Sequence, residues 1–156
     1  MGRINYHKHS PELVGKMMSL YHALGESEID NRVRHLIDIR VSQMNGCAFC
    51  LDMHIKEARL AGENELKLHH LVCWRESELF DRKEKAALEW AEVLTKLPKY
   101  GVSDEVYERV SGCFSEKELS DLTFVIMSIN AWNRVNIAFR TPPGSFDKEM
   151  GLEGVF

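Results

Sequence analysis

The stretch "SEKELSDLTFVIMSINAWNRVNIAFR", residues 115–140, distinguishes an all-helical protein from one that contains a sheet. Its run of Val, Ile and Phe within 122–129 would suit a strand, so this is the segment where a sheet would be expected if the protein had one. However, Ser115 followed by Glu118 is the capping-box pattern that begins a helix, and nothing breaks the pattern before Pro142. The stretch therefore predicts one long, deeply buried helix.

The rest of the chain also has apolar residues at helical spacing, and no segment shows the strict alternation of a strand. Helix-starting residues and Gly, Pro or Asn-Gly breaks divide it into segments. We expect further helices over 10–25, 30–45, 47–62, 64–74, 81–97 and 103–111. The sequence therefore predicts an all-α, compact multi-helix protein that forms a single domain over residues 1–156.

The composition is that of a globular protein, with 156 residues, 44% of them hydrophobic, and a formal charge of −4. Basic residues alternate with acidic ones, so we expect no nucleic-acid partner. We also expect no membrane association, because the N-terminus lacks the apolar run of a signal peptide and no stretch is long and apolar enough to span a bilayer. These features predict a cytoplasmic protein. The tail 141–156, which ends in Phe156, carries apolar residues that suggest docking on the helices.

The chemistry of the chain is expected at "CAFCLDMH", residues 47–54, which contains Cys47, Cys50 and His54. Two thiols three residues apart at a helix start can approach each other, and a helix N-terminus stabilises a thiolate. His54 lies one turn beyond Cys50, close enough to exchange a proton with it. Cys73 and Cys113 are isolated, and we expect them to be packing residues.

Two other interpretations of this motif remain open. The three side chains could simply pack in the core, although their shared helix start and face argue against it. Zinc could bind them, but a structural zinc site requires four ligands, usually as a second spaced pair. Cys73 is isolated and His69 and His70 are adjacent, so no second pair is present. A redox site is the preferred interpretation, with no metal and no cofactor expected.

The chain resembles the alkylhydroperoxidase D-like family of the carboxymuconolactone decarboxylase superfamily. The resemblance covers nearly the whole chain, and the matching stretches are "NYHKHSPELVGKMM" (5–18), "IRVSQMNGCAFCLDMHIKEARLAGE" (39–63), "WRESELFDRKEKAALEWAEVLT" (74–95) and "INAWNRVNIAF" (129–139). It implies an all-helical protomer in a trimer, hexamer or related ring, with thiol peroxidase chemistry near a subunit interface. By this analogy Cys50 attacks the peroxide, Cys47 resolves the sulfenic acid as a disulfide, and His54 belongs to the proton relay.

The sequence departs from the family pattern at two positions. The best-known peroxidases of the family carry a relay Glu twelve residues before the first cysteine, where this chain has His35. They also carry a His just before the second cysteine, where this chain has Phe49. His35 is therefore a candidate substitute in the relay.

Three functional hypotheses follow from these observations. The preferred one is a thiol-dependent peroxidase of antioxidant defence that reduces hydroperoxides through a Cys47–Cys50 disulfide, with a dithiol protein or small thiol as reductant. The second is a non-redox enzyme of the carboxymuconolactone decarboxylase type, which the paired thiols of "CAFC" disfavour. The third is a zinc-binding or redox-sensing protein without enzymatic activity. For each we expect a homo-oligomer, a trimer or hexamer, because the last helix and the tail carry more apolar surface than a monomer should expose.

Overall fold

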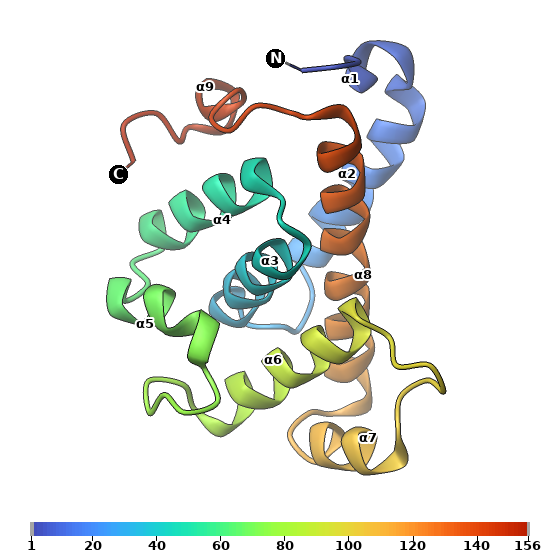
Figure 1. Cartoon of the computed structure of the whole chain (residues 1–156), viewed down its shortest axis with the longest axis vertical. Coiled ribbons are helices and arrows are strands. Elements are labelled where there is room, and N and C mark those ends of the chain that lie inside the picture. Colours follow the sequence, from blue (N-terminus) through green and yellow to red (C-terminus); the bar gives the residue numbers. More distant parts are fainter. Residues whose placement is uncertain (1, 156) are drawn as a thin grey trace.

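The computed structural model describes residues 2–155, and this part of the chain contains helices and no strand (Figure 1). The helices are α1 (Tyr6–His9), α2 (Pro11–Gly25), α3 (Asn31–Asn45), α4 (Ala48–Leu60), α5 (Glu65–His70), α6 (Arg82–Thr95), α7 (Asp104–Ser111), α8 (Glu116–Phe139) and α9 (Asp147–Met150), and η1 (Leu71–Cys73) is a 3₁₀ turn. The expected all-α fold is confirmed.

Helix α3 lies at the centre of the molecule, with α4, α6 and α8 packed around it (Figure 1). Apolar residues recur along it at helical spacing and are almost completely buried: Val33, Leu36, Ile37, Ile39 and Val41. Full burial of each such side chain stabilises the fold by about 1.5–3 kcal/mol. Because α3 packs against α4, α6 and α8, its polar side chains can reach groups on several helices at once.

Helix α8 is the long helix expected from the opening stretch, and its capping box between Ser115 and Glu118 is present. Its burial is one-sided: Leu122, Val125 and Ile126 face the core, whereas Phe124 and Met127 remain about half exposed. The expected deep burial is therefore correct for one face only. Within residues 2–155 no helix, α8 included, combines the length and apolarity needed to cross a membrane.

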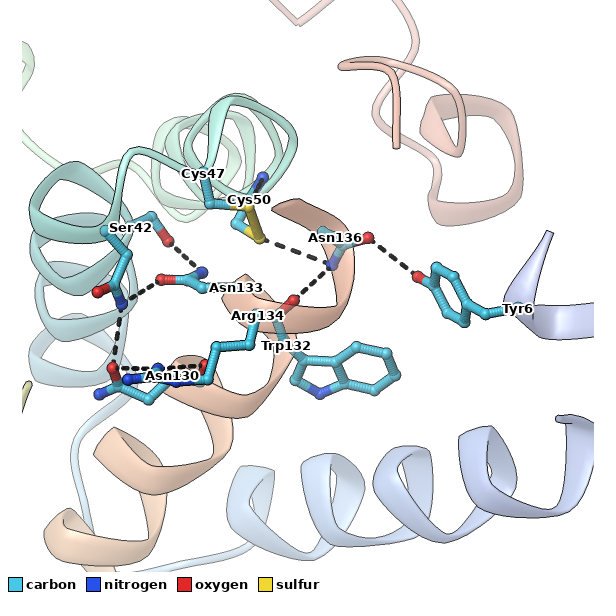
Figure 2. Close-up of a disulfide and its surroundings, with 10 residues drawn as sticks. Tyr6, Ser42, Cys47, Cys50, Asn130, Trp132, Asn133, Arg134 and Asn136 are labelled. Carbon is cyan, nitrogen blue, oxygen red and sulfur yellow. Dashed lines mark hydrogen bonds between the residues drawn. A yellow bond between two sulfur atoms is a disulfide. The ribbon is translucent and has the colours of Figure 1, made fainter. Parts of the chain in front are cut away.

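Four uncharged polar residues join α3 to α8, and we call Ser42, Asn45, Asn130 and Asn133 the amide cluster. The Asn45 amide donates to the side-chain oxygens of Asn130 (3.0 Å) and Asn133 (2.9 Å). Asn133 in turn donates to Ser42 Oγ at 3.1 Å (Figure 2). Asn133 is fully buried, so these bonds satisfy polar groups that water cannot reach.

The segment after α5 differs from the expected helix over 64–74. The α-helix ends at His70 and the chain tightens into η1. In a 3₁₀ turn residues three apart lie on the same side, which lets Leu71 and Trp74 both enter the core. Cys73 is left exposed and Cys113 half buried, so the expectation that both are packing residues was wrong for Cys73.

The two end segments of the chain lie together near the start of α4 (Figure 1). The tail docks as expected: Leu152 is buried, and the Phe146 ring packs edge-on against Phe49. Lys56 of α4 pairs with Asp147 at 2.6 Å. The short helix α1 was not expected from the sequence, and Phe156 lies outside the described residues.

Candidate active site

The two cysteines sit at the sharp corner between α3 and α4. Gly46 ends α3 in the left-handed conformation (φ 72°), which costs glycine little because it has no Cβ. The chain turns at once, so that Cys47 becomes the N-cap of α4, and its sulfur accepts the backbone N–H of Cys50 at 3.3 Å. The Asn-Gly break seen in the sequence thus places both thiols at the start of a helix, Cys47 as its N-cap and Cys50 in its first turn.

Cys47 and Cys50 form a disulfide in the structure, with their Cα atoms 5.4 Å apart (Figure 2). Both residues are buried. When the bond is reduced, the free N–H groups and dipole at the start of α4 favour a thiolate at this position. The pair can therefore exist both as a disulfide and as a reactive dithiol.

A cavity of about 310 Å³ opens beside Cys50, and Cys47 is not among its lining residues. Its walls are mostly apolar and come from α2, α4, α8 and the C-terminal segment: Met18, Leu24, Phe49, Met53, Val125, Ile129, Trp132, Phe146 and Met150. Cavities of this size and character hold small organic ligands. A ligand bound there would meet Cys50 before Cys47.

Four charged side chains lie in or next to the wall of this cavity, and we call Arg34, Asp38, His54 and Glu57 the charged cluster. His54 Nδ1 lies 2.7 Å from Glu57 and 3.8 Å from Asp38. Arg34 lies 3.8 Å from Asp38 along the same face of α3. Arg34, Asp38 and His54 line the cavity, and His54 and Asp38 are almost completely buried.

Burial and mutual contact shift the pKa values within the charged cluster. Burial raises the pKa of Asp38 to about 6. For His54, burial disfavours the charged ring, but the carboxylates of Asp38 and Glu57 outweigh it and raise its pKa. Burial likewise opposes ionisation of Glu57, yet the hydrogen bond with His54 holds its pKa below the ordinary value. Several groups here can therefore exchange protons near neutral pH.

The structure brings Cys47, Cys50 and His54 together, but it places His35 outside the cavity lining. The His35 ring is half buried, and its Nδ1 has no hydrogen-bond partner among the described residues. Burial lowers its pKa, and Glu57 is its strongest favourable charge. Glu57, rather than His35, is the residue that touches His54.

Sequence reasoning missed Asp38, Glu57 and Asn136 as site residues. Glu57 lies three residues after His54, a helical spacing that could have identified it. Asp38 and Asn136 come from α3 and α8, and no local pattern connects them to the cysteines. Asn136 Nδ2 lies 3.7 Å from Cys50 Sγ (Figure 2).

In the part of the chain from 2 to 155, no group of three or more His, Cys, Asp or Glu side chains is arranged to hold a metal ion. The charged cluster is held by Arg34 and by direct contact between His54 and Glu57.

Comparison with known proteins identifies the family. The model of the carboxymuconolactone decarboxylase family matches residues 11–93, more than half of the chain. The chain belongs to this family. Within the carboxymuconolactone decarboxylase family it is of the alkylhydroperoxidase D-like type, which confirms the resemblance seen in the sequence.

The relatives share both sequence and fold with the chain. It is 44% identical to the uncharacterized protein YdfG of Bacillus subtilis over 136 residues, 87% of this chain and 92% of YdfG. It is 36% identical to the uncharacterized protein YnjA of Escherichia coli over 117 residues, 74% of this chain and 63% of YnjA. A solved structure from Agrobacterium tumefaciens, described as a protein of unknown function and a candidate antioxidant defence protein AhpD, superposes with a TM-score of 0.88 at 39% identity, covering 92% of this chain and 98% of that one.

Proposed function

We propose that the protein is a thiol-dependent peroxidase that reduces organic hydroperoxides through the Cys47–Cys50 disulfide. The observation that carries the proposal is the position of Cys50, which lines an apolar cavity while bonded to Cys47. An apolar cavity favours a hydroperoxide with an organic group over hydrogen peroxide, because burying that group releases ordered water. The kinship with a candidate antioxidant defence protein supports the same chemistry.

The reaction proceeds in two steps at the sulfurs. The Cys50 thiolate attacks the terminal peroxide oxygen, the O–O bond breaks, and the leaving alkoxide takes a proton to become an alcohol. Cys50 is then a sulfenic acid. The Cys47 thiolate attacks the Cys50 sulfur, the S–S bond forms, the S–O bond breaks, and water leaves once the hydroxide is protonated. Two electrons from an external dithiol reduce the disulfide and restore both thiols.

The charged cluster supplies the protons in this scheme. His54 follows Cys50 by one helical turn and shares the cavity with it, and its Nδ1 is held by Glu57. The other ring nitrogen is then available to give a proton to the leaving alkoxide. His35 enters the proposal as an outer residue that acts on His54 directly through charge and also through the charge of Glu57.

The physiological setting follows from the need for a reductant. A dithiol protein or small thiol must reduce the disulfide after each turnover, which a reducing compartment provides. We therefore propose a cytoplasmic role in antioxidant defence. Neither a nucleic acid nor a membrane takes part in this scheme.

Hydroperoxide consumption by cysteine variants tests the proposal. With cumene hydroperoxide and dithiothreitol, we expect Cys50→Ser to abolish turnover. Cys47→Ser should permit a single attack and leave Cys50 as a sulfenic or over-oxidised acid, which mass spectrometry detects. Cys73→Ser is the matched control and should consume peroxide at the unaltered rate, because Cys73 is exposed and does not line the cavity beside Cys50. Full turnover by Cys50→Ser would contradict the proposal.

Two further measurements on the purified protein distinguish the proposed peroxidase from the two alternative functions. A non-redox decarboxylase would leave both thiols reduced after exposure to peroxide, and a zinc-binding protein would carry stoichiometric metal when purified. A count of free thiols before and after peroxide, combined with metal analysis, distinguishes all three. We expect two thiols to be lost as the Cys47–Cys50 disulfide.

We also propose that the chain assembles as a homo-oligomer, a trimer or hexamer. One outward side of α8 carries Phe124, Met127 and Ala131 at helical spacing, and all three are exposed. An apolar stripe of this kind on a folded protein is typical of a subunit interface. Light scattering at micromolar concentration tests this, and a strictly monomeric mass would refute it.

A further inference from the structure

Asn136 of α8 contacts the cavity-facing sulfur from the helix opposite α4. Its side chain is buried and lines the cavity, and its Nδ2 lies 3.7 Å from Cys50 Sγ (Figure 2). Cys47 has a different donor, the backbone N–H of Cys50 at 3.3 Å. The two sulfurs of the pair therefore accept hydrogen bonds from different donors.

Two other contacts fix which end of the Asn136 amide faces the sulfur. The backbone carbonyl of Trp132 lies 3.0 Å from Nδ2 and can only accept, so the nitrogen must be on that side. The amide oxygen accepts from the Tyr6 hydroxyl at 3.0 Å. Burial raises the pKa of Tyr6, which keeps this hydroxyl protonated and able to donate. One amide hydrogen is thus committed to Trp132, and the second is left for Cys50.

We propose that Asn136 stabilises Cys50 as a thiolate and that Tyr6 is a positioning residue that holds the Asn136 amide in place. A disulfide sulfur is a weak acceptor, which agrees with the long 3.7 Å contact. A thiolate at the same place would accept far more strongly, and a hydrogen bond to the charged form lowers a thiol pKa. This assignment rests on the proposed role of Cys50 as the attacking thiol.

Other titratable groups also border the cavity. They are His54 on α4, Arg34 and Asp38 on α3, Tyr21 on α2, Tyr6 and His7 on α1, and Glu149 on α9. Within residues 2–155 none of them forms a hydrogen bond to Cys50 Sγ, whereas Asn136 does. A variant at Asn136 therefore changes the direct donor to the sulfur and leaves the surrounding charges in place.

The experiment titrates Cys50 alone, in a background of Cys47→Ser, Cys73→Ser and Cys113→Ser. The rate of alkylation by iodoacetamide is measured against pH, and its midpoint reports the thiol pKa. We expect Asn136→Leu to raise the midpoint by about one pH unit, the value of one hydrogen bond to a charged group. Asn136→Asp should raise it further, because a carboxylate repels the thiolate. Tyr6→Phe should produce a smaller rise.

Asn130→Asp is the matched control. It adds the same charge to the same helix, but Asn130 belongs to the amide cluster and its side-chain oxygen lies 2.9 Å from Arg134, which would pair with the new carboxylate. The midpoint should not move. Circular dichroism identifies any variant that fails to fold. If the α8 variants fail to fold, Tyr6→Phe still tests the proposal, because it removes only a single hydroxyl.

An unchanged midpoint in folded Asn136→Leu, or a midpoint that rises equally in Asn130→Asp, would overturn the proposal. An unchanged midpoint in Tyr6→Phe would overturn the positioning role of Tyr6. Peroxide turnover is measured separately on the unmodified chain. If that chain consumes no hydroperoxide, the proposed function fails, while the order of the alkylation midpoints still decides whether Asn136 sets the acidity of Cys50.

Discussion

The amide cluster and the charged cluster occupy opposite halves of α3, and both join this helix to its neighbours through buried polar groups. The amide cluster contains only neutral side chains, which bond to one another and do not line the cavity. The charged cluster contains ionisable side chains, and three of its four members line the cavity. The same helix therefore has one polar region that fixes packing and one that faces a ligand site.

Dependence on pH distinguishes a buried polar group that only supports packing from one that can take part in chemistry. Neutral hydrogen bonds contribute the same stability at every pH, since no member of the amide cluster titrates. In the charged cluster, burial raises the pKa of Asp38, the two carboxylates raise that of His54, and the hydrogen bond with His54 lowers that of Glu57. The contribution of the charged cluster to stability therefore depends on pH.

The largest expected effect is the loss of protein stability caused by Asn133→Ala. The change leaves the Ser42 hydroxyl without its donor, removes a partner of Asn45, and opens a cavity in the core. We expect a loss of about 3 kcal/mol in the free energy of unfolding. Urea unfolding at pH 5.5 and pH 8 should give the same loss. A loss that changes with pH would show that the amide cluster is coupled to ionisable groups and would break the comparison.

A smaller and pH-dependent effect is expected for Glu57→Gln. The raised pKa of His54 means that its contribution to stability is complete below its ordinary value of 6.5 and is lost as pH rises through the folded value. The lowered pKa of Glu57 means that its contribution is complete above its ordinary value of 4.5 and is lost as pH falls through the folded value. The variant should therefore lose most stability between pH 4.5 and 6.5, by about 1–2 kcal/mol.

Urea unfolding from pH 4 to 9 measures this window, and NMR titration of the His54 ring should show a lower pKa in the variant. Glu89→Gln is a suitable control, because Glu89 pairs with Arg109 at the surface and does not contact the charged cluster. Equal losses at all pH values would mean that Glu57 contributes packing rather than charge.

Local features of the fold were predictable because their causes lie within a few residues. The Asn45-Gly46 break, the capping box at Ser115 and the placement of the two cysteines at a helix start all follow from short patterns, and the structure contains each of them. The end of α5 was not predictable in the same way. The preference of Leu71 and Trp74 for the core overrides the helical pattern there.

The candidate site was predictable only along α4. Cys47, Cys50 and His54 share one helix, so their proximity follows from spacing. Asp38 and Asn136 reach the same place through the packing of α3 and α8, which depends on the whole fold and not on a motif. His35 drew attention because of its position in a family pattern, and its role stays a prediction.

The smallest expected effect is on peroxide consumption by His35→Ala. Its influence must pass through Glu57 and His54, and burial lowers its pKa, so the ring is mostly neutral near pH 7. We expect the rate of Cys50 oxidation to fall roughly twofold or less, as for a weak pair of charges. Stopped-flow measurement of thiol oxidation checks this. A decrease as large as that of His54→Ala would place His35 inside the relay and extend the charged cluster toward the start of α3.

The contact between Cys50 and Asn136 has a consequence for the protein while it is being made. The two residues are 86 positions apart, and Tyr6 is 130 positions from Asn136. At a synthesis rate of about 5–20 residues per second, the ribosome needs roughly 4–17 s to add α8 after it has added the cysteines. During that interval the two thiols lack the amide, the cavity walls of α8 and the C-terminal segment. A nascent chain stalled before α8 should therefore be alkylated at a higher pH than the complete chain, and the full acidity of Cys50 should appear only when the last long helix has docked.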